Sequence, residues 1–143
     1  MIFWETKDPI FWISDPPHFD NGALWTMHIV SYDNRLWMFY TGLNQRVYFQ
    51  QHIGLAYSDR TDGTGWIRYS ENPIVSADPQ WYQTEGDMAW RDPFVVYDEE
   101  HQHWIMYIAA KHNNGPKETR GCIGVALSDD LIHWEVQPPI LAP

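Results

Sequence analysis

Two stretches of the chain, YDNRLWMFYTG at residues 32–42 and IGLAYSD at residues 53–59, return in the same order as YDEEHQHWIMYIAA at residues 97–110 and IGVALSD at residues 123–129. Four aromatic or apolar anchors repeat at similar offsets, namely Tyr32 to Tyr97 at 65, Trp37 to Trp104 at 67, Ile53 to Ile123 at 70 and Trp66 to Trp134 at 68. Self-similarity at a nearly fixed spacing is the signature of repeat architectures. The chain therefore contains two copies of one supersecondary unit.

Each copy is predicted to contain four short strands and almost no helix. β-Branched and aromatic residues cluster between turn residues such as Asp33-Asn34, which is the pattern of strands and hairpins. In IGLAYS and IGVALS large and small residues alternate, whereas the strand before each is apolar throughout. The predicted strands are 26–32, 36–43, 52–58 and 66–69, then 91–97, 104–110, 122–128 and 133–136.

These patterns predict sheets that are covered on both faces, as when four-stranded sheets stack radially as blades. We therefore predict an all-β fold, a partial β-propeller of two four-stranded antiparallel blades preceded by an N-terminal extended arm. The arm is placed at residues 1–24 and one two-bladed domain at 25–143, with blades at about 25–76 and 90–143. The linker at 76–89 and a polar insertion at 113–121 are expected as surface loops.

Composition excludes several classes of function. A chain of 143 residues supports one hydrophobic core, and its formal net charge of -10 would repel a nucleic acid. The single Cys122 lacks the spacing of a zinc ligand, so no metal or other cofactor is expected. The apolar runs are too short to span a membrane and the acidic start MIFWETKDPIFW is unlike a signal peptide, so we expect a protein that is cytoplasmic by default and makes no membrane contact.

One motif stands out as a carrier of chemistry, the segment WRDPFVVYDEE at residues 90–100. Pro93 favours extended geometry for Arg91 and Asp92, which precede a strand. First strands of propeller blades line the central axis, so the side chains at their starts converge where a ligand can sit. Asp92 there could accept hydrogen bonds from sugar hydroxyls or stabilise a cationic transition state. The alternative is an Arg-Asp pair that only caps the strand.

The order of these motifs resembles glycoside hydrolase families 32 and 43, the five-bladed propellers of invertases, fructanases, arabinanases and xylosidases. The resemblance covers about residues 24–143, and its most telling parts are the Arg-Asp-Pro triplet at 91–93, Phe-Tyr-Thr-Gly at 39–42 and the run at 128–135. It implies three acids around the funnel, of which Asp92 alone is matched here. By resemblance Asp92 would orient the sugar and stabilise the transition state, without acting as nucleophile or general acid.

Three further residues are candidates for substrate contact beside Arg91. Trp25 aligns with Trp90 at an offset of 65, and an indole face is a good platform for the apolar face of a sugar. Blade packing is the alternative for both. His28 could also enter the funnel.

Other acids fit the missing roles poorly. Asp15 lies in a sequence similar to a family-32 nucleophile motif, but the residue in register with Asp92 is about Met27, so a turn in the arm is the simpler interpretation. Glu85 and Glu135 are out of register for a general acid. The runs from Ser58-Asp59 to Trp66 and from Ser128-Asp129 to Trp134 resemble Asp-box turns, and we expect their side chains to tie the turn and not to meet substrate. The acids and histidines near His101 fit a charged hairpin tip better than a metal site.

Both reaction types of glycosidase need two carboxylates across the scissile bond, so the set within this chain is incomplete. Three hypotheses follow: a fragment of a glycoside hydrolase, a carbohydrate-binding or scaffold protein without catalysis, and an enzyme completed by self-association. Carbohydrate is the expected partner. Open blade faces favour pairing, so we also expect a homo-oligomer of at least two copies.

Overall fold

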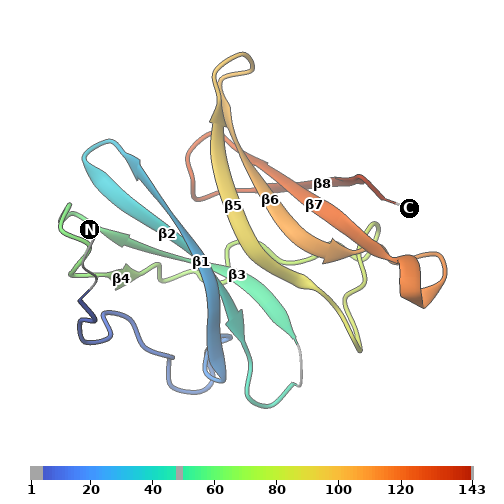
Figure 1. Cartoon of the computed structure of the whole chain (residues 1–143), viewed down its shortest axis with the longest axis horizontal. Helices are drawn as coiled ribbons and strands as arrows, with labels where there is room; N and C mark the ends of the chain where they lie inside the picture. The colour runs from blue at the N-terminus through green and yellow to red at the C-terminus, as the bar shows by residue number, and fades with distance from the viewer. Residues whose placement is uncertain (1–4, 48–49, 143) are drawn as a thin grey trace.

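The computed structural model describes residues 5–47 and 50–142, so that residues 1–4 of the predicted arm and Pro143 of the predicted second blade lie outside the described part. Within it the chain forms two four-stranded antiparallel sheets, with strand orders β1-β2-β3-β4 and β5-β6-β7-β8, and one 3-10 turn (η1, Lys117–Thr119). Figure 1 shows the two sheets side by side, with β1 and β5 at the centre. The all-β, two-bladed prediction is confirmed.

The strand bounds agree closely with the expected positions. Blade 1 consists of β1 (Ala23–Tyr32), β2 (Arg35–Leu43), β3 (Gln51–Ser58) and β4 (Ile67–Arg68), and blade 2 consists of β5 (Trp90–Asp98), β6 (His103–Lys111), β7 (Gly121–Ser128) and β8 (Glu135–Ile140). The largest differences are at the end of β8, which lies four residues later than predicted, and at the start of β1, which lies three residues earlier. Asp33 and Asn34 both adopt positive φ, as the tight turn between β1 and β2 requires.

The main hydrophobic core lies between the two blades. Phe39 and Leu55 project from blade 1, and Trp90 and Met106 project from blade 2. The ring of Phe39 meets the edge of the Trp134 ring at a centroid distance of 5.6 Å. Burial of this kind is the dominant stabilising contribution to a fold, so neither blade is a separate folding unit in this structure.

The register of the repeat differs by one residue from the aromatic alignment in β1 and β2. Gly54 and Gly124 are equivalent in sequence and pair with Tyr40 and Ile108 respectively. Continuing along these ladders makes Leu24, which pairs with Gly42, equivalent to Trp90, which pairs with Ala110. The predicted equivalences of Trp25 with Trp90 and of Trp37 with Trp104 are therefore wrong, since a slip of one residue turns a side chain to the opposite face of a sheet.

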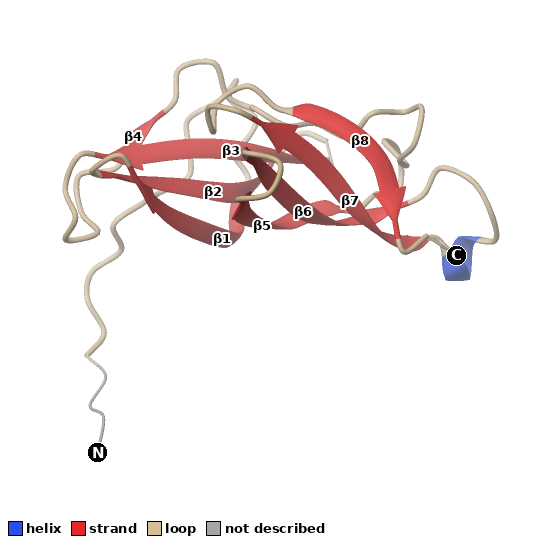
Figure 2. Ribbon diagram, turned by 90° about the horizontal axis from the view of Figure 1, so that it is seen from above, coloured by secondary structure: helices blue, strands red, loops and turns tan. Residues whose placement is uncertain are grey.

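The second half of the predicted arm packs against blade 1. Phe11 and Phe19 lie against Tyr40, with ring centroids 5.1 and 6.0 Å away. Asp20 is 1% exposed; its Oδ2 accepts hydrogen bonds from the Tyr40 hydroxyl at 3.0 Å and from Arg68 Nε at 2.9 Å. Burial, with the nearby Asp20 carboxylate as the next cause, raises the pKa of Tyr40 far above its usual value. Figure 2 shows the first described residues of the arm leading away from the sheets.

The linker between the blades is partly core, in contrast to the predicted surface loop. Tyr82 is buried against Trp90, donates its hydroxyl proton to the carbonyl of Gln137 at 2.7 Å and accepts the amide of Val125 at 3.3 Å. Apolar residues of this linker close the edge of the core between the blades. The polar residues around them in the sequence had suggested a surface loop. No helix in the described ranges is long and apolar enough to cross a membrane.

Candidate functional site

Asp92 occupies a bulge at the start of β5, the innermost strand of blade 2. Arg91 pairs with Ala109 and Phe94 with Tyr107, so Asp92 and Pro93 stand opposite a single residue of β6. Bulges turn a side chain away from its regular direction, and the Asp92 carboxylate is 43% exposed. Its φ of 57° is left-handed, so the extended geometry predicted from the following proline is wrong at this residue.

The bulge is held from the neighbouring blade. The amide of Asp92 donates a hydrogen bond to Oγ1 of Thr41 in β2 at 3.0 Å, and Thr41 is fully buried. Nε of Arg91 lies 3.5 Å from Oδ2 of Asp92, with both side chains more than one third exposed. An ion pair this exposed contributes little stability. The Arg91 guanidinium and the Asp92 carboxylate are nevertheless in contact on the surface, as the pair was predicted to be.

Trp25 lies on the blade 1 side of the same position. Leu24 pairs with Gly42 and Met27 with Tyr40, so a matching bulge in β1 stands opposite Thr41 and contains Trp25. Trp25 and Asp92 therefore flank one residue, Thr41. The indole of Trp25 is 36% exposed, which leaves it available as an aromatic contact surface.

Trp90 does not have the role predicted for it as a sugar platform. It is fully buried, its Nε1–H donates to the carbonyl of Val75 at 3.3 Å, and its ring lies 4.7 Å from that of Tyr82. A Cβ on Gly124 would come within 2.8 Å of the indole, so glycine makes room for it. Trp90 is a packing residue, because the register turns its side chain toward blade 1.

His28 connects the two blades. Its Nδ1 accepts the amide proton of Val95 at 3.0 Å, and its ring lies 4.6 Å from the ring of Phe94. A neutral imidazole that accepts at Nδ1 carries its proton on Nε2. Burial lowers the pKa of His28, which favours this neutral form. His28 lies beside the strand that carries Asp92, and a sugar contact remains a prediction.

Two residues at this seam between the blades were not predicted from the sequence, Thr41 and Gln51. Gln51 is 1% exposed; its Oε1 accepts the amide of Trp90 at 3.1 Å and its Nε2 donates to the carbonyl of Met88 at 3.4 Å. The sequence contains one signal for each residue. Thr41 is a polar residue inside an otherwise apolar strand, FYTGL, and Gln51 is a glutamine where the second copy has Gly121.

The other acids lie elsewhere. Asp15 is exposed in a turn of the arm, whose aromatic rings cover the face of blade 1 opposite the face that carries Thr41. Glu85 lines a cavity of about 320 Å³ between the β2–β3 loop and the linker, together with Gln50 and Met88. Glu135 lies at the start of β8, where it pairs with Leu127 of β7.

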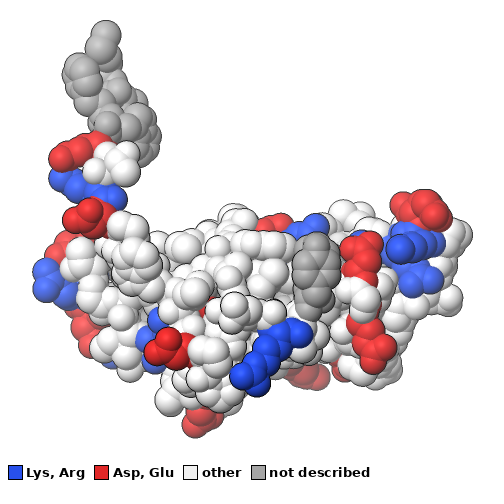
Figure 3. Space-filling view, turned by 90° about the horizontal axis from the view of Figure 1, so that it is seen from below, with Lys and Arg blue, Asp and Glu red and all other residues white. Residues whose placement is uncertain are grey.

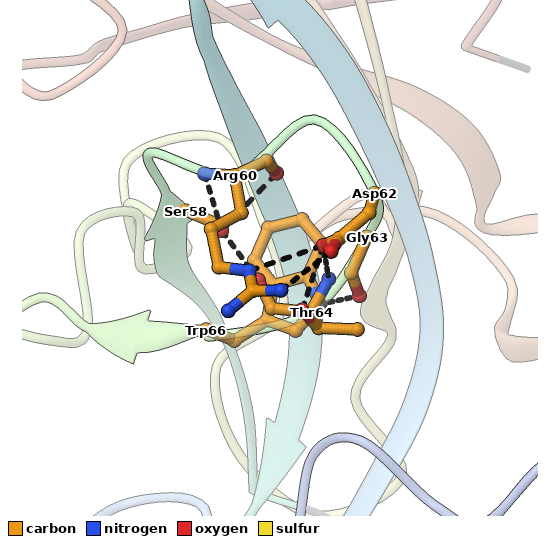
Figure 4. A network of polar contacts seen from close by, with 6 residues as sticks. All are labelled: Ser58, Arg60, Asp62, Gly63, Thr64 and Trp66. Atoms are coloured by element: carbon orange, nitrogen blue, oxygen red, sulfur yellow. Dashed lines mark hydrogen bonds and ion pairs between the residues drawn. The ribbon is translucent and has the colours of Figure 1, made fainter.

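The two Asp-box-like turns are closed by their own side chains. In the first, Asp62 accepts from Arg60, from the Thr64 amide and from the Thr64 hydroxyl, while the Trp66 indole donates to the carbonyl of Gly63 (Figure 4). These hydrogen bonds, that of Arg60 first, lower the pKa of Asp62 strongly. The prediction that side chains tie the turn is confirmed, although the tie is made by Asp62 and not by Asp59, which pairs with Arg35.

The second turn is closed in the same way. Asp130 accepts from the amides of Ile132 and His133, and the His133 ring lies 2.7 Å away. Burial opposes ionisation of Asp130, but the hydrogen bonds, led by that of His133, outweigh it and lower its pKa to about 2.

The hairpin tip between β5 and β6 is tied by Asp98, which accepts from the His101 ring at 2.8 Å. In the described part of the chain no three His, Cys, Asp or Glu side chains lie close enough together to hold a metal ion. On the face that Figure 3 shows, Lys and Arg stand among uncharged residues or beside acids, without a continuous basic surface.

The fold and the site define a partial β-propeller whose two blades meet beside an exposed Arg-Asp-Pro carboxylate on β5. The model of the glycosyl hydrolases family 32 N-terminal domain matches residues 1–143, and the chain belongs to this family. Family membership confirms the resemblance drawn from the repeat and from the Arg-Asp-Pro triplet.

Three similar proteins show how much of a whole relative the chain represents. An extracellular exo-inulinase of Aspergillus niger is 33% identical over 90 residues, which is 61% of this chain and 15% of the relative. Fructan 1-exohydrolase IIa from Cichorium intybus superposes with a TM-score of 0.71 at 18% identity, covering 92% of this chain and 23% of that protein. A Bombyx mori β-fructofuranosidase mutant in complex with sucrose gives a TM-score of 0.58 at 25% identity, covering 76% and 21%. The chain spans less than a quarter of each.

Proposed function

We propose that this chain is the part of a fructoside-directed glycoside hydrolase that supplies Asp92 as the sugar-orienting carboxylate. The observation that supports the proposal is the exposed Asp92 side chain, projecting from a bulge at the seam of two blades with Trp25 on the other side of Thr41. A fixed carboxylate can accept hydrogen bonds from neighbouring sugar hydroxyls, and an indole can cover the apolar face of the ring. The names of the three similar proteins favour a fructose-containing ligand.

We further propose that the chain alone binds such a sugar without hydrolysing it. Hydrolysis with either stereochemistry requires two carboxylates on opposite sides of the scissile bond. Asp92, as the sugar-orienting carboxylate, takes neither of these two roles, and Asp15, Glu85 and Glu135 come from other parts of the described structure. On this proposal the chain is an incomplete catalytic unit, and the second candidate function is a non-catalytic carbohydrate-binding or scaffold protein.

The test combines sugar binding with sugar release. Sucrose and kestose are titrated into the wild type, Asp92→Asn and the control Asp129→Asn, which removes an exposed carboxylate from the β7–β8 turn. Binding is followed by tryptophan fluorescence and hydrolysis by reducing-sugar release. We expect binding that only Asp92→Asn weakens, with no turnover. Turnover in the wild type would overturn the incomplete unit, and the absence of binding to either sugar would overturn the assignment of Asp92.

A second copy of the chain is the proposed cover for the outer face of blade 2. Phe94 is 52% exposed, and Ile105, Tyr107 and Leu127 are partly exposed on the same face, whereas Phe39 and Leu55 on the corresponding face of blade 1 are buried. Burying this face would remove apolar area from water, which favours association. Light scattering over a concentration series should give at least a dimer that Ile105→Glu dissociates; a monomeric mass throughout would overturn this proposal.

A further inference from the structure

The free edge of β5 is satisfied by side chains of blade 1. β5 is the first strand of its sheet, so amides along its outer edge have no neighbouring strand to bond. Three of them donate instead to side-chain acceptors, the amide of Trp90 to Gln51, that of Asp92 to Thr41 and that of Val95 to His28. The backbone that carries the Asp92 carboxylate is thereby fixed by the neighbouring blade.

We infer that Thr41 and Gln51 are positioning residues for Asp92, holding the bulge from which its carboxylate reaches a sugar. Both side chains are at least 99% buried, and their contacts fall on the residues just before Asp92 and on Asp92 itself. The inference deepens the proposed function and, for the effect on sugar, rests on it.

The repeat shows that blade architecture alone does not demand this pair. The equivalent of Thr41 in blade 2 is Ala109, which pairs with Ile123 as Thr41 pairs with Ile53. The equivalent of Gln51 is Gly121, which pairs with Lys111. Neither Ala109 nor Gly121 has a polar side-chain atom, yet both blades build the same four-stranded sheet. The polar pair occurs on the blade that adjoins Asp92.

The same comparison applies to the bulge. In the corrected register the residue of blade 1 equivalent to Asp92 is Thr26, an exposed side chain in the β1 bulge. The φ of 57° at Asp92 is a conformation that most residues avoid, and it persists only where the surroundings fix it. Thr41 Oγ1 fixes it directly, so removing that hydroxyl should release the bulge locally. Removing the Gln51 side chain should release the chain at Trp90, two residues earlier.

Hydrogen exchange of individual amides, measured by NMR on the full chain, tests the inference. Thr41→Val keeps the shape of the side chain and removes the acceptor, so exchange of the Asp92 amide should become about tenfold faster, as expected for losing one good hydrogen bond. Exchange of the Met106 amide, in the neighbouring strand β6, should change by less than about twofold. General destabilisation would instead accelerate exchange at Asp92 and at Met106 alike. Thr41→Ser restores the hydroxyl and should restore protection.

Gln51→Met provides an independent variant. It should speed exchange of the Trp90 amide and leave most of the protection at Asp92, because Thr41 remains. If Thr41→Val does not fold, Thr41→Ala carries the same comparison at Asp92, and Gln51→Met is read at the Trp90 amide. Unchanged exchange at Asp92 in a folded Thr41 variant, or equal acceleration at Asp92 and Met106, would overturn the inference.

Sucrose titration of the same proteins separates this inference from the proposed function. Positioning predicts an affinity about tenfold weaker in Thr41→Val and near the wild-type value in Thr41→Ser, corresponding to one lost contact in the bound state. Equal affinity in Thr41→Val and wild type would overturn the effect on sugar. If no form of the protein binds sucrose but the Asp92 amide is released selectively, the proposed sugar function fails and the positioning of Asp92 stands.

Discussion

Replacing Trp90 with Phe and Trp25 with Ala should separate packing from ligand contact at the two indoles that the sequence placed together. Trp90 is fully buried, so Trp90→Phe removes roughly 40 Å³ of ring volume, which at about 24 cal/mol per Å³ costs about 1 kcal/mol as cavity. The lost apolar burial costs about another 1 kcal/mol. The lost hydrogen bond to Val75 adds about 0.5 kcal/mol, a low value because that carbonyl also accepts from the Ile53 amide.

The free energy of unfolding of Trp90→Phe should therefore fall by about 2.5 kcal/mol, and its melting temperature by about 7 °C. Trp25→Ala should cost less stability than Trp90→Phe, because Trp25 is already 36% exposed in the folded protein whereas Trp90 is fully buried. Its affinity for sucrose should weaken about fivefold, from a lost stacking contact of about 1 kcal/mol.

Urea denaturation followed by circular dichroism gives the stabilities, and fluorescence titration gives the affinities. Trp12→Ala is the matched control for Trp25, since it removes another exposed indole, one that lies in the arm. The reasoning would be refuted if Trp90→Phe kept full stability while losing sucrose affinity, or if Trp25→Ala destabilised the fold as much as Trp90→Phe.

Three further predictions concern the fold that presents the site. Arg68→Met should cost about 3 kcal/mol in urea denaturation because it removes the ion-pair partner of buried Asp20, whereas Lys7→Met, from an exposed pair, should change nothing measurable. Gly124→Ala should cost about 2 kcal/mol, since its Cβ would meet Trp90 at 2.8 Å and Ala110 at 3.2 Å, while Gly121→Ala in the same strand meets nothing and should be neutral. Burial lowers the folded-state pKa of His28 below 6.5, so its stabilising effect is complete above that pH and is lost as pH falls through the folded pKa. The stability advantage of wild type over His28→Asn should accordingly be present at about pH 7.5 and reduced at about pH 5, and an advantage that grew on acidification would contradict it.

The fold was predictable because the repeat and strand patterns are local signals. Alternating large and small residues in β3 and β7 identify strands without tertiary information, and the two glycines in them mark close packing against Tyr40 and Trp90. The register of β1 and β5 was less accessible, because the turn between β5 and β6 is two residues longer than the turn between β1 and β2, so the offset between equivalent positions is 66 in the first strands and 68 in the second strands. Aligning the two copies by their aromatic residues therefore made Trp25 the equivalent of Trp90, although the two side chains project from opposite faces of their sheets.

The site was predictable only in part for the same reason. The Arg-Asp-Pro triplet identified Asp92 because its chemistry is carried by adjacent residues. Thr41 contacts Asp92 from 51 residues away in sequence, and Gln51 contacts Trp90 from 39 residues away. Their polarity is visible in the sequence, but their partners become visible only in the tertiary structure. The left-handed φ of Asp92 is likewise set by tertiary contacts that override the preference imposed by Pro93.

The two blades contribute different residues to the site, because blade 2 carries the carboxylate and blade 1 carries the side chains that hold it. This difference explains why two copies of one unit differ at particular positions. A carboxylate at the seam needs an acid on one blade and a means of holding it on the other, so identical blades would give each seam the same contacts. Here blade 2 carries Asp92 where blade 1 has Thr26, and blade 1 carries Thr41 and Gln51 where blade 2 has Ala109 and Gly121. Exchanging the two polar residues for their blade 2 counterparts, Thr41→Ala with Gln51→Gly, should therefore leave two recognisable blades and a mobile Asp92. If the double variant kept Asp92 ordered and protected, the seam would owe its geometry to the blades alone.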